Sequence, residues 1–278
     1  MAMMASPAVI LLFSAGLALG QDERVAVNGK EYPLDMAFNS ADDQYEGCAK
    51  NMANFVEAIF LKRELRNNDE FGDAWREVEQ AHYCDNPGHG LTRNHCIALF
   101  MYTGTGVYYS FNSAVRNGKE KYNSLTFEWY SLQFFITEAL QILQGKTTCR
   151  WTYRGTRLEF DKDIKHKEIR LGAFTSSSLN HSIAQAFGNT SCFTTYTCYG
   201  VYIAQYSPFD EEEVLIPPYE TFVVIDVLSR ASDPDLWCDT VYVLNSTGTR
   251  SDLNCAVVTL PFFSITKSHV GLLKLGFS

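Results

Sequence analysis

The chain has 278 residues, of which 14% are aromatic and 20% charged. It contains 23 Lys and Arg and 32 Asp and Glu, which gives a net charge of −9. This composition excludes disordered and collagen-like chains, because it supplies enough apolar and aromatic surface for a core. The acidic balance argues against nucleic acid as a partner, since phosphate binding requires a basic surface. The length suits one large domain or two small ones.

The N-terminus is typical of a secretory signal peptide. Residues 1–20 carry no charge, and their apolar run, Ala8 to Leu19, is too short to span a bilayer. We therefore expect a cleaved signal over 1–20, with a buried N-terminal helix as the alternative, and a secreted or lumenal mature chain over 21–278. We expect neither a transmembrane segment nor a lipid-anchor signal in that chain. Three glycosylation sequons agree with this route, at Asn180, Asn189 and Asn245.

The first half of the sequence, about residues 35–146, predicts helices. Ser40 to Asp43 resembles a capping box. The apolar residues that follow at helical spacing are Met52, Phe55, Val56, Ile59 and Phe60. Further helices are expected over 71–82, over 107–117 with Gly118 as C-cap, and over 125–143 with Gly145 at the end.

The second half, about residues 147–265, predicts short strands. Runs rich in β-branched and aromatic residues cover 151–153, 193–206, 220–227, 239–244 and 256–262, and a turn is expected at 245–248. One helix, over 179–187 with Ser178 as N-cap and Gly188 as C-cap, interrupts them. Helices followed by strands predict an α+β domain.

A cluster of acidic residues, Glu211-Glu212-Glu213, directly precedes the apolar run Val214 to Ile216. If these residues enter a strand, Glu211 and Glu213 point to the same face, because side chains alternate along a strand. Such a pair can stabilise a developing glycosyl cation and orient a nucleophile. The alternative is a solvated acidic loop, since charged runs usually face water.

Two further motifs have polar side chains where a ligand could bind. Arg154, followed by Gly155, can hold a phosphate or carboxylate with its guanidinium, and the glycine permits close approach of a ligand. The serines from Ser176 to Ser178 lead into the predicted helix at 179. A surface arginine and simple helix capping are the alternatives for these two motifs.

The interpretation of the eight cysteines depends on whether the protein is cytosolic or secreted. Cys84, His89, His95 and Cys96 could be drawn as a zinc site. In a secreted protein, disulfides are the favoured interpretation, so we expect no metal.

The order of Arg154, Ser176 and the E-x-E motif at 211–213 resembles the R-S-E class of mono-ADP-ribosyltransferases. Other stretches resemble the vertebrate arginine-specific ecto-enzymes of that class, and together they span about residues 34–262. These stretches are Leu34 to Ala37, Asp42 to Cys48, Tyr102-Thr103, Phe111-Asn112-x-Ala114-Val115-Arg116, Thr137 to Leu140, Tyr153 to Gly155, Phe174 to Ser178 and Glu211 to Pro217.

The resemblance implies an NAD cleft in a β-sandwich core behind a helical lobe. It implies that Arg154 holds the phosphate and ribose region of NAD, that Gly155 contacts nicotinamide, and that Ser176 orients Glu213, the catalytic glutamate. Glu211 then favours transfer to arginine, in target proteins or small guanidino compounds, over NAD hydrolysis. Two aromatic residues, Tyr102 and Phe187, are either part of the NAD pocket or packed in the core.

The resemblance also guides the disulfide pairing. Cys48–Cys255 and Cys149–Cys198 match two disulfides of that family, and we then expect Cys84–Cys96, which are close in sequence, and Cys192–Cys238. We expect a monomer. An NAD glycohydrolase and a non-catalytic extracellular binding protein on the same scaffold are the alternatives to the transferase.

Overall fold

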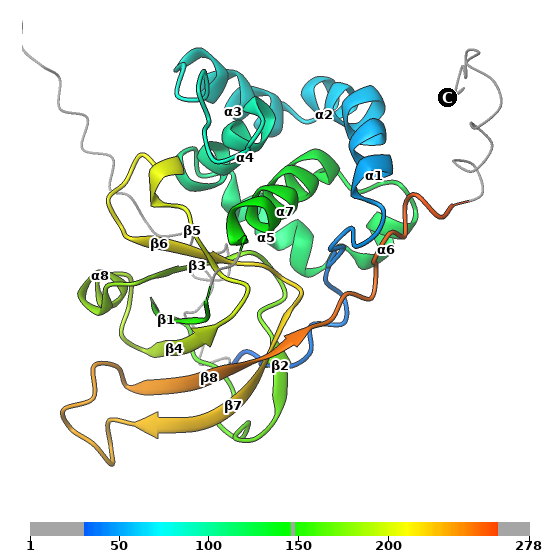
Figure 1. Cartoon of the computed structure of the whole chain (residues 1–278). Coiled ribbons are helices and arrows are strands. Elements are labelled where there is room, and N and C mark those ends of the chain that lie inside the picture. The colour runs from blue at the N-terminus through cyan, green and yellow to red at the C-terminus, as the bar shows by residue number, and fades with distance from the viewer. Residues whose placement is uncertain (1–30, 146–147, 261–278) are drawn as a thin grey trace, which may run out of the picture.

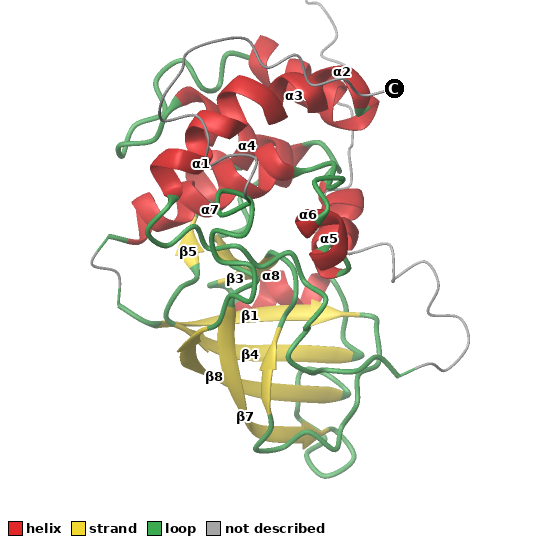
Figure 2. Ribbon diagram, turned by 90° about the vertical axis from the view of Figure 1, so that its right-hand side faces the viewer, coloured by secondary structure: helices red, strands yellow, loops and turns green. Residues whose placement is uncertain are grey.

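The computed structural model describes residues 31–145 and 148–260, so the expected signal peptide and the residues from 261 onward lie outside the described residues. Helices form one half of the molecule and strands the other (Figures 1 and 2). Within the described residues, helices α1 to α7 precede every strand of the sheet, and α8 is inserted among the strands. This is the α+β arrangement that the sequence predicted.

The helical half is built around one central helix, α7. In chain order its elements are α1 (Ala49–Phe55), the π-helical turn η2 (Val56–Phe60), α2 (Leu61–Asn67), α3 (Asp69–Gln80), α4 (Arg93–Gly104), α5 (Tyr108–Arg116), α6 (Lys119–Asn123) and α7 (Tyr130–Gln144). Helix α7 contacts α1, η2, α2 and α4. Because it is apolar nearly all round, it is buried on most sides, as its sequence indicated.

The N-terminal end of α7 is capped from another helix. The N–H groups of Tyr130 and Ser131 donate to the carboxylate of Glu64 at 2.8 and 3.0 Å. The first N–H groups of a helix have no partner within it, so a buried helix end needs such an acceptor. Burial raises the pKa of Glu64 to about 7.

The predicted helix over 125–143 is too long at its N-terminal end. Leu125 has a φ of +62°, and α7 begins only at Tyr130. Phe127 and Trp129 continue the apolar pattern because they are buried in the same core, although they are not helical. Gly145 ends α7 with a φ of +46°, as expected.

The strands form one hydrogen-bonded sheet. They are β1 (Arg150–Thr156), β2 (Glu168–Arg170), β3 (Thr175–Ser178), β4 (Ser191–Thr197), β5 (Val201–Tyr202), β6 (Glu213–Ile216), β7 (Glu220–Ser229) and β8 (Thr240–Thr249), in the order β2-β7-β8-β4-β1-β3-β6-β5. β4 and β8 are parallel, and the other neighbouring pairs are antiparallel. The order places β1, β3 and β6 side by side, although long segments separate them in the chain.

Three of the predicted β features are wrong in detail. The predicted turn at 245–248 lies inside β8, where a register shift between the pairs Thr221–Gly248 and Phe222–Ser246 leaves Thr247 as the extra residue of a bulge. The predicted strand over 193–206 is divided into three elements. β4 ends at Thr197, and the short strand β5 and a 3₁₀ turn, Ala204–Tyr206, follow it. Residues 256–260 of the last predicted strand form turns, and 261–262 lie outside the described residues.

The helix among the strands, α8 (His181–Ala186), is shorter than predicted. Its N-cap is Asn180, whose side chain accepts the N–H of Ser182 at 3.0 Å. The predicted N-cap, Ser178, belongs to β3, and the C-cap is Phe187. The capping serine was misassigned because asparagine serves the same role two residues later.

The predicted capping box at 40–43 is wrong, because α1 begins only at residue 49. The buried Asp42 instead forms an ion pair with the buried Arg170 of β2. The neighbouring Asp43 accepts the backbone N–H of Cys255 at 2.9 Å. In Figure 1 the blue N-terminal and orange C-terminal segments therefore run side by side and join the two halves of the molecule.

Four disulfides bond the expected pairs of cysteines. They are Cys48–Cys255, Cys84–Cys96, Cys149–Cys198 and Cys192–Cys238. Both cysteines of the zinc alternative are thus bonded to each other. Among the residues that the structure describes, no helix combines the length and the apolar character needed to cross a membrane.

Candidate active site

The three motifs of the R-S-E pattern meet on adjacent strands. Tyr153 of β1 pairs with Ser178 of β3, and Ser178 pairs in turn with Glu213 of β6. Arg154 crosses between the strands and donates from its guanidinium to the carbonyl oxygen of Ser176 at 2.8 Å. The sheet order therefore brings together an arginine, a serine and a glutamate from three separate parts of the chain.

Glu213 is a buried carboxyl group at the first position of β6, with 3% of its surface exposed. Burial, together with the charge of nearby Glu211, raises its pKa to about 7. The Ser176 hydroxyl and the Arg154 guanidinium act in the opposite direction and favour the charged form. The Ser176 hydroxyl is buried and has no hydrogen-bond partner of ordinary geometry within the described residues. It lies beside Glu213, where it can also contact a ligand.

Glu211 and Glu213 lie close together for a different reason from the one the sequence suggested. β6 begins only at Glu213, so strand alternation does not relate the two carboxylates. Glu212 between them has a φ of +47°, a left-handed conformation that is unusual for a side chain other than glycine. Partial burial raises the pKa of Glu211. The acidic cluster is thus half-buried and turned inward, which argues against a solvated loop.

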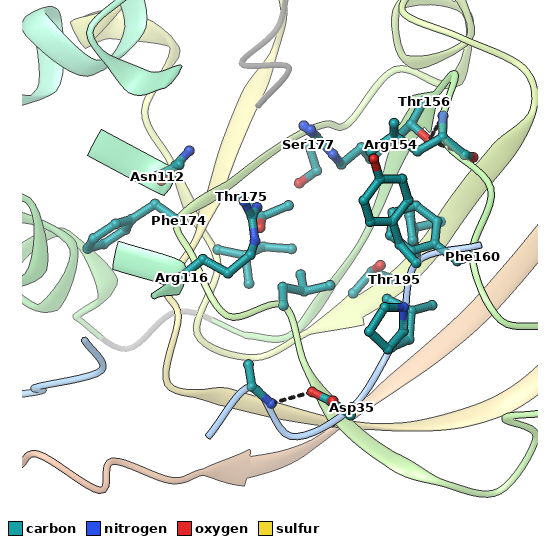
Figure 3. A pocket seen from close by; sticks show the side chains of 18 of the residues that line it. Asp35, Asn112, Arg116, Arg154, Thr156, Phe160, Phe174, Thr175, Ser177 and Thr195 are labelled. Atoms are coloured by element: carbon teal, nitrogen blue, oxygen red, sulfur yellow. Dashed lines mark hydrogen bonds between the residues drawn. The ribbon is translucent and has the colours of Figure 1, made fainter. Parts of the chain in front are cut away.

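A cavity of about 450 Å³ lies beside Arg154, between the sheet, the N-terminal segment and α5 (Figure 3). Arg154, Thr156 and Ser177 line it from the strands, and Asn112 and Arg116 line it from α5. Glu211, Ser176 and Glu213 are not among its lining residues, so Arg154 connects the cavity with the glutamates.

Asn112 is oriented by its neighbour Tyr102. Its side-chain Nδ2 donates to the Tyr102 hydroxyl at 3.0 Å, whereas its buried Oδ1 has no partner within the described residues. Buried polar atoms are normally paired, so an unpaired acceptor at the cavity wall is suited to a ligand donor. Asn112 and Arg116 stand four residues apart on α5 and therefore share one face of the helix.

The two helix-α5 residues were part of the family resemblance, but the sequence analysis gave them no binding role. Their spacing was the available signal. It could not be used, because nothing in the sequence shows which face of α5 lies over the sheet.

Tyr102 matches the core-packing alternative. It is fully buried, its hydroxyl donates to the Phe174 carbonyl at 3.0 Å, and it is not among the residues that line the cavity. It supports the cavity from behind, through Asn112 and Phe174. Phe187 is half-buried at the C-terminal end of α8, and its proposed contact with NAD stays a prediction.

Gly155 is required by packing inside the protein. A Cβ atom at this position would lie less than 3.0 Å from the backbone oxygens of Ala184 and Gly188, which real Cβ atoms essentially never do. The C-terminal end of α8 therefore packs closely against β1 at this position. The contact of Gly155 with nicotinamide stays a prediction.

The three sequon asparagines lie on the β half. Asn189 is exposed in the loop after α8, Asn245 is half-exposed in β8, and Asn180 is the N-cap of α8. Within the described residues, no group of three or more His, Cys, Asp or Glu is arranged to hold a metal ion.

The cavity is suited to an anionic ligand, because two arginines, Arg116 and Arg154, line it. The buried carboxyl group of Glu213 lies outside the lining of this cavity and can stabilise a positive centre beside it.

Comparison with known proteins identifies the family. The sequence model of NAD:arginine ADP-ribosyltransferases matches residues 34–237. GPI-linked NAD(P)(+)–arginine ADP-ribosyltransferase 1 of rabbit (Oryctolagus cuniculus) is 37% identical over 82% of this chain and 75% of its own length. Ecto-ADP-ribosyltransferase 5 of human (Homo sapiens) is 34% identical over 78% of each chain.

Solved structures agree. The crystal structure of the eucaryotic mono-ADP-ribosyltransferase ART2.2 superimposes with a TM-score of 0.69 and 33% identity, covering 80% of this chain and 98% of that one. A mutant of the same enzyme in complex with NAD gives a TM-score of 0.67. The chain described here belongs to the NAD:arginine ADP-ribosyltransferase family.

Proposed function

We propose that this protein transfers ADP-ribose from NAD to the guanidinium group of arginine, in target proteins or small guanidino compounds, and releases nicotinamide. The observation that carries the proposal is the buried Glu213 beside Arg154 and Ser176, with Glu211 close enough to influence its charge. The family membership of the chain and the NAD complex of its relative support the choice of substrate.

The chain's residues fit NAD as the substrate. Arg154 and Arg116 at the cavity supply positive charge for a diphosphate, and the unpaired Asn112 Oδ1 can accept from a ribose hydroxyl or an adenine amine. The buried Ser176 hydroxyl lies beside Glu213, where we place the ribose that carries nicotinamide. In this assignment Arg154 lies between the two ends of the substrate.

Glu213 is proposed to stabilise the positive charge on the ribose as its bond to nicotinamide breaks. The electron pair of that bond leaves with the nicotinamide ring nitrogen, and an arginine side-chain nitrogen then forms the new bond to the same ribose carbon. The carboxylate acts best where water is excluded, and Glu213 is almost completely buried.

Glu211 is proposed to prepare the arginine acceptor. A guanidinium is protonated at neutral pH and is a poor nucleophile until a carboxylate orients it and accepts its proton. The partial burial that raises the pKa of Glu211 makes it a better proton acceptor than an exposed glutamate. Without an oriented arginine, water is the competing acceptor, and the reaction becomes NAD hydrolysis.

The test uses labelled NAD and agmatine, an arginine analogue, and measures both ADP-ribosyl-agmatine and free nicotinamide. We expect Glu213→Gln to lower both products at least about 100-fold, because the charge that stabilises the transition state is lost. Glu211→Gln should lose transfer and keep part of the hydrolysis. The exposed loop residue Asp210, as Asp210→Asn, serves as the matched control. Nicotinamide release without any ADP-ribosyl-agmatine from the unmodified chain would show an NAD glycohydrolase instead.

The cellular setting is part of the proposal. The four disulfides and the ecto-enzyme relatives fit an extracellular protein. We propose removal of residues 1–20, one catalytic domain over the remaining chain, and glycosylation at the three sequons. We further propose that the protein acts as a monomer, which size measurement of the secreted protein would test.

A further inference from the structure

The junction between β3 and α8 holds the loop that carries Glu211. The Ser178 hydroxyl donates to the Glu211 carbonyl at 2.7 Å, and the Leu179 N–H donates to the Glu212 carbonyl at 3.1 Å. The Asn180 side-chain Nδ2 donates to the Glu212 carboxylate, also at 3.1 Å. Three consecutive residues of one segment thus contact two consecutive residues of the loop.

The Asn180 amide has a fixed orientation. Its Oδ1 accepts the N–H of Ser182 and caps α8, so its Nδ2 must point away from the helix, toward Glu212. One side chain therefore ties the start of α8 to the acidic loop. An aspartate at this position would keep the cap and lose the donor.

Glu212 needs this support because of its backbone. The left-handed region is unfavourable for a residue other than glycine, and such conformations persist where surrounding contacts fix them. The φ of Glu212 decides how Glu211 is directed relative to Glu213, since Glu212 is the residue between them. Glu213 itself is held by its strand pairing with Ser178 and does not depend on the Glu212 side chain.

We infer that Asn180 is a positioning residue for the arginine acceptor, acting on Glu211 through Glu212. The inference rests on the role of Glu211 in the proposed function. Loss of the Asn180–Glu212 hydrogen bond releases Glu211 and impairs transfer to arginine, whereas NAD cleavage at Glu213 continues. A purely structural role would lower both reactions together.

The sequon at Asn180 requires a suitable background, because a glycan would be attached to the nitrogen that donates to Glu212. Ser182→Ala removes the sequon and keeps both the Asn180 side chain and the backbone N–H that it caps. All variants are therefore made in Ser182→Ala, and agmatine transfer and acceptor-free nicotinamide release are measured for each.

In that background, Asn180→Asp removes the donor and places a second carboxylate against Glu212. We expect the ratio of transfer to hydrolysis to fall about tenfold, with a higher KM for agmatine, and nicotinamide release to change less than about twofold. Glu212→Ala removes the same bond from the other side and should lower the ratio similarly. Because a misfolded variant loses nicotinamide release as well, that rate reports on folding.

The decisive variant reverses the bond. Combining Asn180→Asp with Glu212→Gln places an amide donor in the loop and an acceptor on α8, so we expect the ratio to return to that of the background. Glu212→Gln alone keeps an acceptor oxygen and should stay near the background ratio. An unchanged ratio in Asn180→Asp, or a parallel loss of both products without recovery in the double variant, would overturn the inference. Absence of transfer in the background protein would instead overturn the proposed function.

Discussion

Replacing Glu211 with Gln is expected to shift the pH dependence of NAD cleavage toward lower pH. Glu213 must be charged to stabilise the positive ribose, and burial raises its pKa to about 7 in the free protein. Activity is therefore lost as the pH falls through 7. The Glu211 charge contributes to the raised pKa, so its removal makes Glu213 easier to ionise.

The size of the effect follows from these charges. A carboxyl group with a pKa of about 7 is about one tenth ionised at pH 6 and about nine tenths ionised at pH 8, so cleavage should rise about tenfold between these values. Two like charges about 4 Å apart repel by about 1 kcal/mol even in water, which corresponds to about 0.7 of a pH unit. We expect Glu211→Gln to move the acid limb toward lower pH by a shift of this order.

The assay is nicotinamide release without an added acceptor, because an acceptor would add its own titration. The pH profile of kcat/KM for NAD reports groups of the free enzyme. The control Asp210→Asn removes a charge from the same loop. Asp210 is not among the causes of the raised pKa of Glu213, so the pH profile of this variant should match that of the unmodified chain.

Two results would refute this reasoning. A limb that moves to higher pH in Glu211→Gln would mean that the Glu211 charge does not oppose ionisation of Glu213. A limb that disappears in that variant would assign the titration to Glu211 itself.

Two stability predictions concern residues outside the reaction. Gly155→Ala should destabilise the protein by about 1–3 kcal/mol and lower activity, because its methyl group would press on backbone oxygens of the α8 region. Thermal unfolding checks this, and an unchanged melting temperature would contradict it. Asp42→Ala should cost about 3–5 kcal/mol, because it leaves the buried Arg170 charge without its carboxylate. Denaturant unfolding measures this cost. The control is Asp73→Ala, which removes one partner of an exposed ion pair and should change the free energy of unfolding by less than about 1 kcal/mol.

Local patterns in the sequence predicted helices and strands well where the buried residues recur with the period of the secondary structure itself. The stretch from Met52 to Phe60 is helical, with Met52, Val56 and Phe60 buried. The same pattern misled at Phe127 and Trp129, which are buried without being helical. The spacing of apolar residues indicates which side chains are buried. It indicates a helix only where the helical backbone hydrogen bonds also continue.

Capping residues show a similar limit. Ser40 and Ser178 have the chemistry of N-caps, but the Ser40 hydroxyl donates to the Gly172 carbonyl and that of Ser178 to Glu211. A hydroxyl group satisfies a turn, a distant carbonyl or a helix end equally well. Long-range partners of this kind are set by the fold and leave no mark in the local sequence.

By itself, the sequence determined the α+β class, the composition of the site and the order of its motifs. Arg154, Ser176, Glu211 and Glu213 could be selected because few residue types carry this chemistry, and their order resembles one family. Only the tertiary structure decided which cavity Arg154 lines, that Asn112 and Arg116 face it, and that a left-handed Glu212 directs the acidic pair. These features depend on strand order and helix packing, which bring distant residues together, whereas sequence patterns report mainly on near neighbours.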